Sequence, residues 1–251
     1  MLGFSHHDLN DNDPNDNDVS KGTPMIALQQ VTHDLYSNIH KGIRRDLFAL
    51  TERAGNVDPS FRSGRVDLAE HLDRTVELLV THAHHEDVHV QPSIEKFLPD
   101  LAVQIETDHE KIEARLVDLQ EMAYDAINAM PSAQRFAVHR LYVELASFTS
   151  AYLAHQDVEE RLVMPGLEKA IGVEAAVGIT AAIVSSIPPD EMAQSLALML
   201  PALNIDDRAE LLGGIRAGAP APVFEGVWGL TGSVLAPTDY ADLGKRLQIA
   251  A

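Results

Sequence analysis

Apolar residues recur every three to four positions over four long stretches of the chain, the period of an amphipathic helix. We expect helices over about 25–54, 66–91, 99–130 and 132–165. Thr23 and Pro24 suit the start of the first helix, and Pro92, Pro131 and Pro165 mark the ends of the others. Long helices joined by short links predict an all-α, antiparallel up-down four-helix bundle over residues 25–168.

The segments on either side of this bundle have different patterns. Residues 1–24 are rich in Asn and Asp and lack any helical period, so we expect a flexible acidic tail. Residues 172–251 contain short apolar stretches separated by breaks such as "SIPPDE" and "RAGAP". They predict a small helical C-terminal subdomain, and this subdomain contains no histidine.

Composition excludes several functions. Asp and Glu number 38 against 19 Lys and Arg, and the net charge of −19 repels nucleic acid and anionic lipid. The absence of cysteine excludes disulfides, iron–sulfur clusters and thiol catalysis, and it suits a reducing cytoplasm. The most apolar run, 175–187, is shorter than the roughly 20 residues of a membrane span. We therefore expect a cytoplasmic protein without nucleic-acid or membrane partners, and homo-oligomerisation is left open.

The second and fourth predicted helices end in the same motif. "HAHHEDVHVQP" begins at His82 and "HQDVEERLVMP" begins at His155, and both fit H-x-x-x-E-[DE]-x-x-x-x-P. His82 and Glu86 are four residues apart, as are His155 and Glu159, so each pair lies on one face of its helix.

The first and third predicted helices also repeat each other. "HKGIRRDLFAL" from His40 and "HEKIEARLVDL" from His109 both fit H-x-x-I-x-x-x-L-x-x-L. The chain thus contains two copies of a unit, and all four histidines lie on the apolar stripes of their helices. Isolated ionised groups are costly in such a core, whereas a shared cation compensates them.

A lone histidine on an apolar stripe is more often a hydrogen-bonded core residue than a ligand, and a single His/Glu pair is a weak signal. Four inward histidines and two inward acids in a duplicated order favour a metal site. The set is too rich in nitrogen for Mg²⁺ or Ca²⁺ and lacks the sulfur of structural zinc. Six ligands suit two metal ions bridged by carboxylates, most naturally iron with a water-derived bridge, although manganese and zinc stay open.

Two alternatives concern the choice of ligands. Glu86–His89 and Glu106–His109 both read E-x-x-H, as in ferritin-like di-iron bundles, but that scheme leaves the histidine and glutamate of the fourth helix unused. His33 precedes His40 by seven residues on the same predicted stripe, and the internal repeat favours His40. Further histidines and a tyrosine are candidates for outer hydrogen-bonding or proton-relay roles, or for ordinary packing: His33, Tyr36, His71, His85 and His89.

With these motifs, the chain resembles the hemerythrin-like, or HHE cation-binding, family over about 25–168. The resemblance implies a bundle that holds two iron ions joined by an oxo or hydroxo bridge. The implied imidazole ligands are His40, His82, His109 and His155, and the implied bridging carboxylates are Glu86 and Glu159. The segment after residue 172 resembles extensions of some bacterial members.

One departure changes the expected chemistry. Oxygen-carrying hemerythrins have a fifth histidine one turn from the ligand of the third helix, where this chain has Ile105 and Glu113. The loss of a nitrogen ligand favours ferric iron with open coordination, and Glu113 becomes a further outer candidate. We therefore expect binding of, or reaction with, O₂, H₂O₂ or nitric oxide, as in oxidative or nitrosative stress or in a di-iron oxidase. A turnover enzyme would be a peroxidase-like, catalase-like or O₂-activating oxidoreductase. The alternatives are a reversible sensor or storage module and a polar core with only a structural role.

Overall fold

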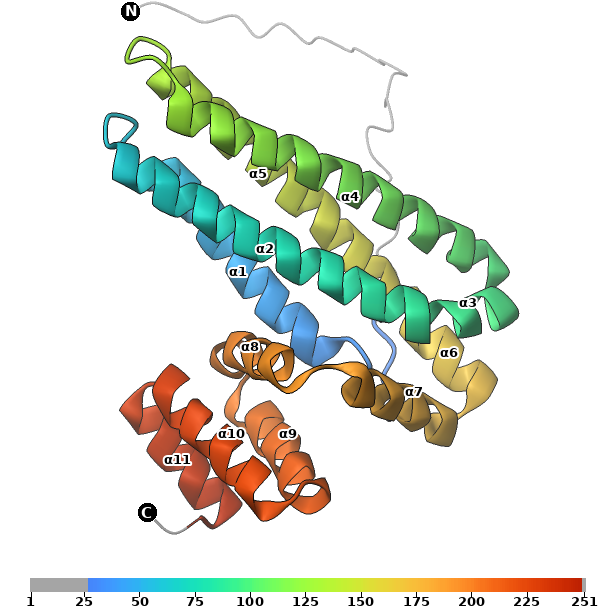
Figure 1. Cartoon of the computed structure of the whole chain (residues 1–251). Coiled ribbons are helices and arrows are strands. Elements are labelled where there is room, and N and C mark those ends of the chain that lie inside the picture. Colours follow the sequence, from blue (N-terminus) through green and yellow to red (C-terminus); the bar gives the residue numbers. More distant parts are fainter. Residues whose placement is uncertain (1–26, 250–251) are drawn as a thin grey trace, which may run out of the picture.

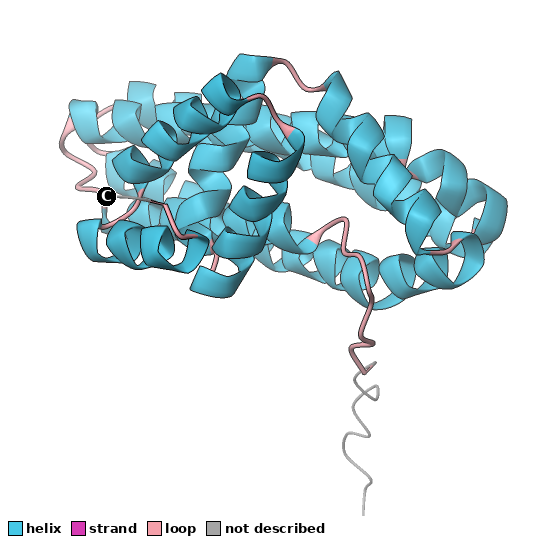
Figure 2. Cartoon of the chain, turned by 90° about the horizontal axis from the view of Figure 1, so that it is seen from below, coloured by secondary structure: helices cyan, strands magenta, loops and turns pink. Residues whose placement is uncertain are grey.

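The computed structural model describes residues 27–249. Within that range every regular element is a helix and no strand occurs, as Figures 1 and 2 show. The prediction of an all-α protein is confirmed. The predicted tail over 1–24, with Thr23 and Pro24, lies outside the described residues.

Four long helices form the bundle. They are α1 (Ser37–Asn56), α2 (Arg62–His89), α4 (Pro99–Asn128) and α5 (Gln134–Val158). α1 packs against α2 and α5, and α4 packs against the same two helices, which closes the bundle (Figure 1). Their apolar stripes meet in one core that includes Leu47, Leu72, Leu116, Leu145 and Phe148, all buried.

Short helices close one end of the bundle. α3 (Gln91–Phe97) connects α2 to α4, and α6 (Met164–Ile171) continues the fourth long helix. They bring Ile94 and Leu167 into a second apolar cluster with Ile105. This cluster shields the neighbouring bundle interior from solvent at that end.

The first long helix starts later than the sequence pattern predicts. Residues 27–36 are not helical, so the expected helix over 25–54 is wrong in its described N-terminal part. The Asp34 carboxylate accepts hydrogen bonds from the backbone N–H groups of Tyr36 and Ser37 and thereby begins α1. The Glu168 carboxylate accepts hydrogen bonds from the backbone N–H groups of Thr32 and His33. These bonds hold the segment against α6 in a non-helical conformation.

The fourth long helix also continues beyond its predicted end at Pro165. A π-helical turn, η1 (Glu159–Val163), joins α5 to α6, and its Met164 N–H donates to the Glu159 carbonyl. A proline ring clashes with the carbonyl four residues earlier, and a widened turn relieves that clash. The helix ends at Gly172, whose φ of 80° suits glycine.

The C-terminal region consists of short helices, as the sequence predicts. They are α7 (Val173–Ser186), α8 (Pro189–Met199), the 3₁₀ turn η2 (Leu200–Ala202), α9 (Ile205–Gly218), α10 (Ala221–Val234) and α11 (Pro237–Leu247). Leu196, Leu212 and Leu243 form a separate core here, beside stacked Trp228 and Tyr240 rings. α7 contacts α2, and α8 packs across α1 (Figure 1). Among the described helices, none has the length and apolar character that a membrane crossing requires.

Candidate metal centre

The six predicted ligand side chains converge inside the bundle. α1 and α4 contribute one histidine each, α2 contributes a histidine and a glutamate, and so does the segment formed by α5 and η1. Their ligand atoms form two groups within 4.8 Å, His40, His82 and Glu86 in one, and Glu86, His109, His155 and Glu159 in the other. Glu86 belongs to both groups, so the arrangement offers two neighbouring positions for a cation.

The two carboxylates lie between the imidazoles. Glu86 has Oε1 3.1 Å from Nε2 of His82 and Oε2 3.5 Å from Nε2 of His109. Glu159 has Oε2 3.4 Å from Nε2 of His40 and Oε1 3.4 Å from Nε2 of His155. Each carboxylate therefore faces one histidine of each half of the sequence repeat, which is the placement of a bridging ligand.

Two further acids orient the imidazoles of the candidate ligands on α1 and α4. Nδ1 of His40 lies 2.9 Å from Glu160, and Nδ1 of His109 lies 2.9 Å from Asp87. With Nδ1 donating to a carboxylate, the Nε2 lone pair of each ring points into the cluster. Arg44 donates to Glu160 over 2.7 Å and holds that carboxylate in place.

The cluster contains buried polar atoms that no protein group satisfies. They are Nε2 of His40, Nε2 of His109, Nδ1 of His155, both carboxylate oxygens of Glu86 and Oε2 of Glu159. Glu159 is 1 % exposed and His40 is 0 % exposed. Unpaired polar atoms are rare in protein interiors and require an explanation. Imidazole nitrogens and carboxylate oxygens that converge in this way fit a transition-metal pair and satisfy that requirement.

The electrostatics of the imidazoles also suit metal binding. Burial lowers the pKa of His82 to about 4 and that of His155 to about 3, so both rings are neutral at pH 7 and can donate a lone pair. Burial alone would lower the pKa of His109, but Glu86 and Asp87 raise it overall.

The pKa values of the two carboxylates shift in opposite directions, although burial raises both. Burial opposes ionisation of Glu86, yet the imidazoles of His82 and His109 outweigh it and lower its pKa. Burial and the neighbouring Glu86 raise the pKa of Glu159 well above its usual range. Two buried acids side by side are thus unfavourable without a cation between them.

Two buried tyrosines lie against the ligand histidines. The ring centroids of Tyr36 and His40 are 5.2 Å apart, and those of Tyr152 and His155 are 5.8 Å apart. Burial, together with Glu86 and Glu159, raises the pKa of both phenols well above 10.0. Both are neutral phenols at pH 7 and form apolar walls of the cluster.

The remaining candidate residues do not join the cluster. His33, His85 and His89 bond to Thr180, Glu191 and Ser186 of the C-terminal helices, over 2.7, 2.8 and 3.1 Å. His71 pairs with Asp46, and Glu113 is exposed. Because residue 33 precedes α1, the expected shared stripe of His33 and His40 is wrong, and it is His40 that lies in the cluster.

The ferritin-like alternative does not match the structure. Its E-x-x-H pairs require Glu106 and His89 in the centre, but Glu106 is exposed and His89 contacts the end of α7. His155 and Glu159, which that scheme leaves unused, lie in the cluster.

Three residues that contact the candidate ligands were not identified from the sequence. Asp87 and Glu160 each follow the glutamate of their motif, and this repeated second acid was the available signal. Tyr152 lies three residues before His155, much as Tyr36 lies four before His40, but such an aromatic on an apolar stripe is ordinarily core.

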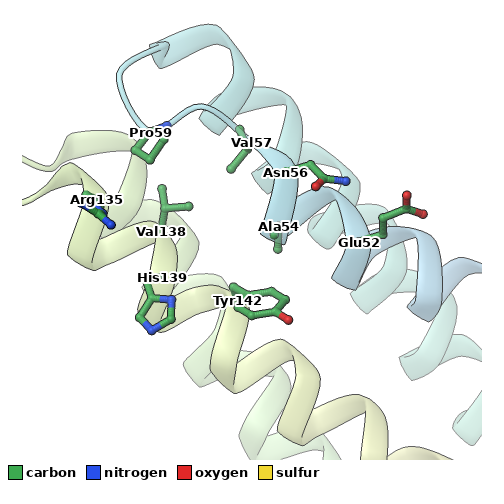
Figure 3. A pocket seen from close by; sticks show the side chains of 10 residues that line it. Glu52, Ala54, Asn56, Val57, Pro59, Arg135, Val138, His139 and Tyr142 are labelled. Atoms are coloured by element: carbon green, nitrogen blue, oxygen red, sulfur yellow. The ribbon is translucent and has the colours of Figure 1, made fainter.

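Clefts occur beside the cluster and far from it. One of about 330 Å³ between α4 and α5 reaches His155 and is bordered by Asp108 and Lys111. Another, of about 560 Å³, lies where α1 ends and α5 begins, and Glu52 on α1 and Arg135 and His139 on α5 are among the residues that line it (Figure 3). None of the six candidate ligands lines this second cleft.

Comparison with known proteins assigns a family to most of the bundle. Residues 32–173, more than half of the chain, match the family described as Hemerythrin HHE cation binding domain. No curated protein and no solved structure gives a significant match. The matched range includes all six candidate ligands and ends at the first residue of α7.

Proposed function

Since this chain belongs to the hemerythrin HHE cation-binding family, we propose that it is a non-haem di-iron protein that reacts with O₂, H₂O₂ or nitric oxide. The observation that carries the proposal is the position of Glu86, which belongs to both groups of ligand atoms. A carboxylate shared between two groups is typical of a paired site, whereas a single ion would leave one of the two groups without a metal. A reducing cytoplasm, as predicted from the absence of cysteine, would keep such iron ferrous.

In this proposal His40 and His82 would hold one ion, and His109 and His155 would hold the other. Glu86 and Glu159 would be shared between the two ions. When bound, a ferrous pair supplies two electrons to a small oxidant or a binding position for nitric oxide. Glu160 and Asp87 keep the Nδ1 protons of His40 and His109, so that both rings present Nε2 to the metals.

The surroundings of His109 favour reaction over reversible oxygen carriage. Glu113, one turn later on α4, is exposed, and Ile105, one turn earlier, is buried among apolar residues. Neither side chain would add a ligand to an ion held by His109 and His155. The buried phenols Tyr36 and Tyr152 limit water at the site, and this suits small uncharged reactants.

The test combines metal analysis with turnover. We expect about two irons per chain in the purified full-length protein, near-ultraviolet charge-transfer absorption, and consumption of added H₂O₂ or O₂. Glu86→Gln removes a ligand of both groups and is expected to lose both irons and the absorption. Asp157→Asn, at an exposed acid paired with Arg161, is the matched control and should change neither. Protein that lacks metal and is unaffected by a chelator, or that holds only zinc, contradicts the proposal.

A further inference from the structure

An apolar cavity of about 260 Å³ lies between the bundle and the C-terminal helices. Its bundle wall comes from the start of α1 and from α2, and its opposite wall comes from α7, α8 and α9. Representative wall residues are Ile39 and Leu78 on one side, and Ile183, Leu196 and Ile215 on the other. Two of the candidate metal ligands, His82 and Glu86, also line it, so the cavity adjoins the metal centre.

The lining specifies the charge of an occupant. No lysine or arginine is among the lining residues, so the cavity offers no ammonium or guanidinium group to balance the charge of a phosphate or carboxylate. Two carboxylates line the cavity. Asp34 already accepts hydrogen bonds from two backbone N–H groups, and Glu86 faces the imidazoles of the cluster. Neither is available to an organic cation. The wall is otherwise mainly apolar, with a few hydroxyl and imidazole groups, and this suits an uncharged molecule with an apolar body.

The volume limits the size of the occupant. A cavity of about 150 Å³ holds benzene, and pockets for drug-sized ligands begin at about 300 Å³. The cavity at 260 Å³ lies between these values and fits one substituted ring or a short branched chain.

Specific polar contacts hold the far wall in place. The His85 ring on α2 donates to the Glu191 carboxylate on α8 over 2.8 Å. Thr180 on α7 bonds to the ring of His33 over 2.7 Å. α8 itself crosses α1 so closely that a Cβ on Gly42 would lie 3.0 Å from Leu198. Hydrogen bonds and close packing therefore join the helices on the two sides of the cavity.

The far wall also lies outside the family domain. The family match ends at residue 173, whereas every residue of α7, α8 and α9 that lines the cavity follows it. The cavity is thus built jointly by the family domain and by the segment that this chain carries after it.

We propose that this cavity is a binding site for a small, uncharged organic molecule with an apolar body, placed directly beside the metal centre. Binding in the cavity requires no metal and goes beyond the proposed function. Only the contact of the occupant with reacting iron rests on that function. The C-terminal helices thereby gain a role, since they supply half of a ligand site.

The test measures binding of phenol and of benzoate to the full-length protein by equilibrium dialysis, with and without prior removal of metal. We expect phenol to bind both forms, and benzoate, a ring of similar size with a negative charge, to bind neither. Ser195→Phe fills the cavity from α8 and should weaken phenol binding at least about tenfold. Ala193→Phe, at an exposed position of α8 that does not line the cavity, is the control and should leave binding unchanged.

A second filling variant, Ile183→Trp on α7, repeats the test from another wall, and helix content by circular dichroism identifies variants that fold. The proposal is overturned if phenol does not bind, if benzoate binds as well as phenol, or if folded filling variants bind phenol like the control. Iron counted in the same samples separates the two proposals. Phenol binding without iron leaves the cavity site standing and removes the di-iron function, and iron without phenol binding does the reverse.

Discussion

At the scale of single residues, the acids that hold the imidazoles matter as much as the ligands. Asp87 and Glu160 each accept a hydrogen bond from the Nδ1–H group of a candidate ligand. Asp87→Ala should lower metal affinity by about 10- to 100-fold, because the ring of His109 loses its orientation and part of its basicity. Competition against a chelator of known affinity measures this change.

A second variant, Asp157→Ala, is the matched control for Asp87→Ala. Asp157→Ala removes an acid that pairs with Arg161 on the surface of the fourth helix and contacts no imidazole. It should retain metal affinity within about twofold, since an exposed ion pair contributes little. Equal losses in Asp87→Ala and Asp157→Ala would mean that the Asp87–His109 bond has no role in metal binding.

Asp46 gives a residue-scale prediction for pH. Burial alone would raise its pKa, but hydrogen bonds from His71 and Thr75 outweigh burial and lower it below 3.8. A carboxyl with a lowered folded-state pKa adds stability above its unfolded pKa and loses it as the pH falls through the folded value. Asp46→Asn should therefore cost about 1 kcal/mol near pH 6 and progressively less below about pH 4.

Urea unfolding at several pH values checks this prediction, with Asp118→Asn, an exposed acid on α4, as the control. The difference in unfolding free energy between wild type and Asp46→Asn should shrink as the pH falls. A difference that grows in acid would show that the paired form is not the ionised carboxylate.

The residue scale also shows what sequence patterns can find. The repeated motifs placed His40, His82, His109 and His155 together with both glutamates, because the spacing of a helix determines which residues share a face. The patterns misplaced His33, since its conformation depends on the carboxylate of Glu168, 135 residues away in sequence. Contacts of that kind leave no periodic signal.

At the scale of elements, α1 and α8 approach closely at Gly42. A Cβ at this position would lie 3.0 Å from Cγ of Leu198 and 3.4 Å from the backbone Cα of Met199. Gly42→Leu should cost about 1–3 kcal/mol and loosen α8, because the α8 backbone must move to admit the side chain. Hydrogen exchange of α8 amides, faster in the variant, is the measurement.

Gly178 on α7 provides the matched control for this substitution. Nothing lies within 4 Å of a Cβ built there, so Gly178→Leu removes only a helical glycine and should be neutral or stabilising by up to about 1 kcal/mol. Unchanged α8 exchange in Gly42→Leu would mean that the contact between the helices tolerates a side chain.

Helix ends were less predictable than helices. Pro92 and Pro165 occupy the same position in the two motifs, yet α2 ends before the first and the fourth helix continues through the second. The difference arises from packing. Gly166 lies so close to Leu98, 2.9 Å from an added Cβ, that α6 stays in contact with the segment between α3 and α4. A proline signals an interruption, and the tertiary contacts decide between a break and a widened turn.

At the scale of the whole molecule, the placement of the C-terminal helices could not be predicted. Their apolar periods predict helices with an apolar face, but not the surface against which each packs. The contacts that place them, such as His85 with Glu191 and Lys41 with Asp207, join polar residues far apart in sequence. The cavity beside the metal centre follows from that placement and was equally invisible.

Metal binding should also couple the four long helices, and Glu159 gives a prediction whose sign depends on the metal. Its carboxylate is buried beside Glu86 with one oxygen unpaired, which is costly without a cation and favourable with one. Glu159→Gln should therefore leave the melting temperature of chelator-treated protein unchanged or higher. In metal-loaded protein the same variant should melt lower than wild type.

A metal at about a hundredfold excess over Kd adds about 2.7 kcal/mol, or about 5–10 °C in Tm for a chain of this size. Calorimetry of both forms gives the four melting temperatures. An equal loss in both would indicate that Glu159 stabilises the bundle by itself, without a metal partner.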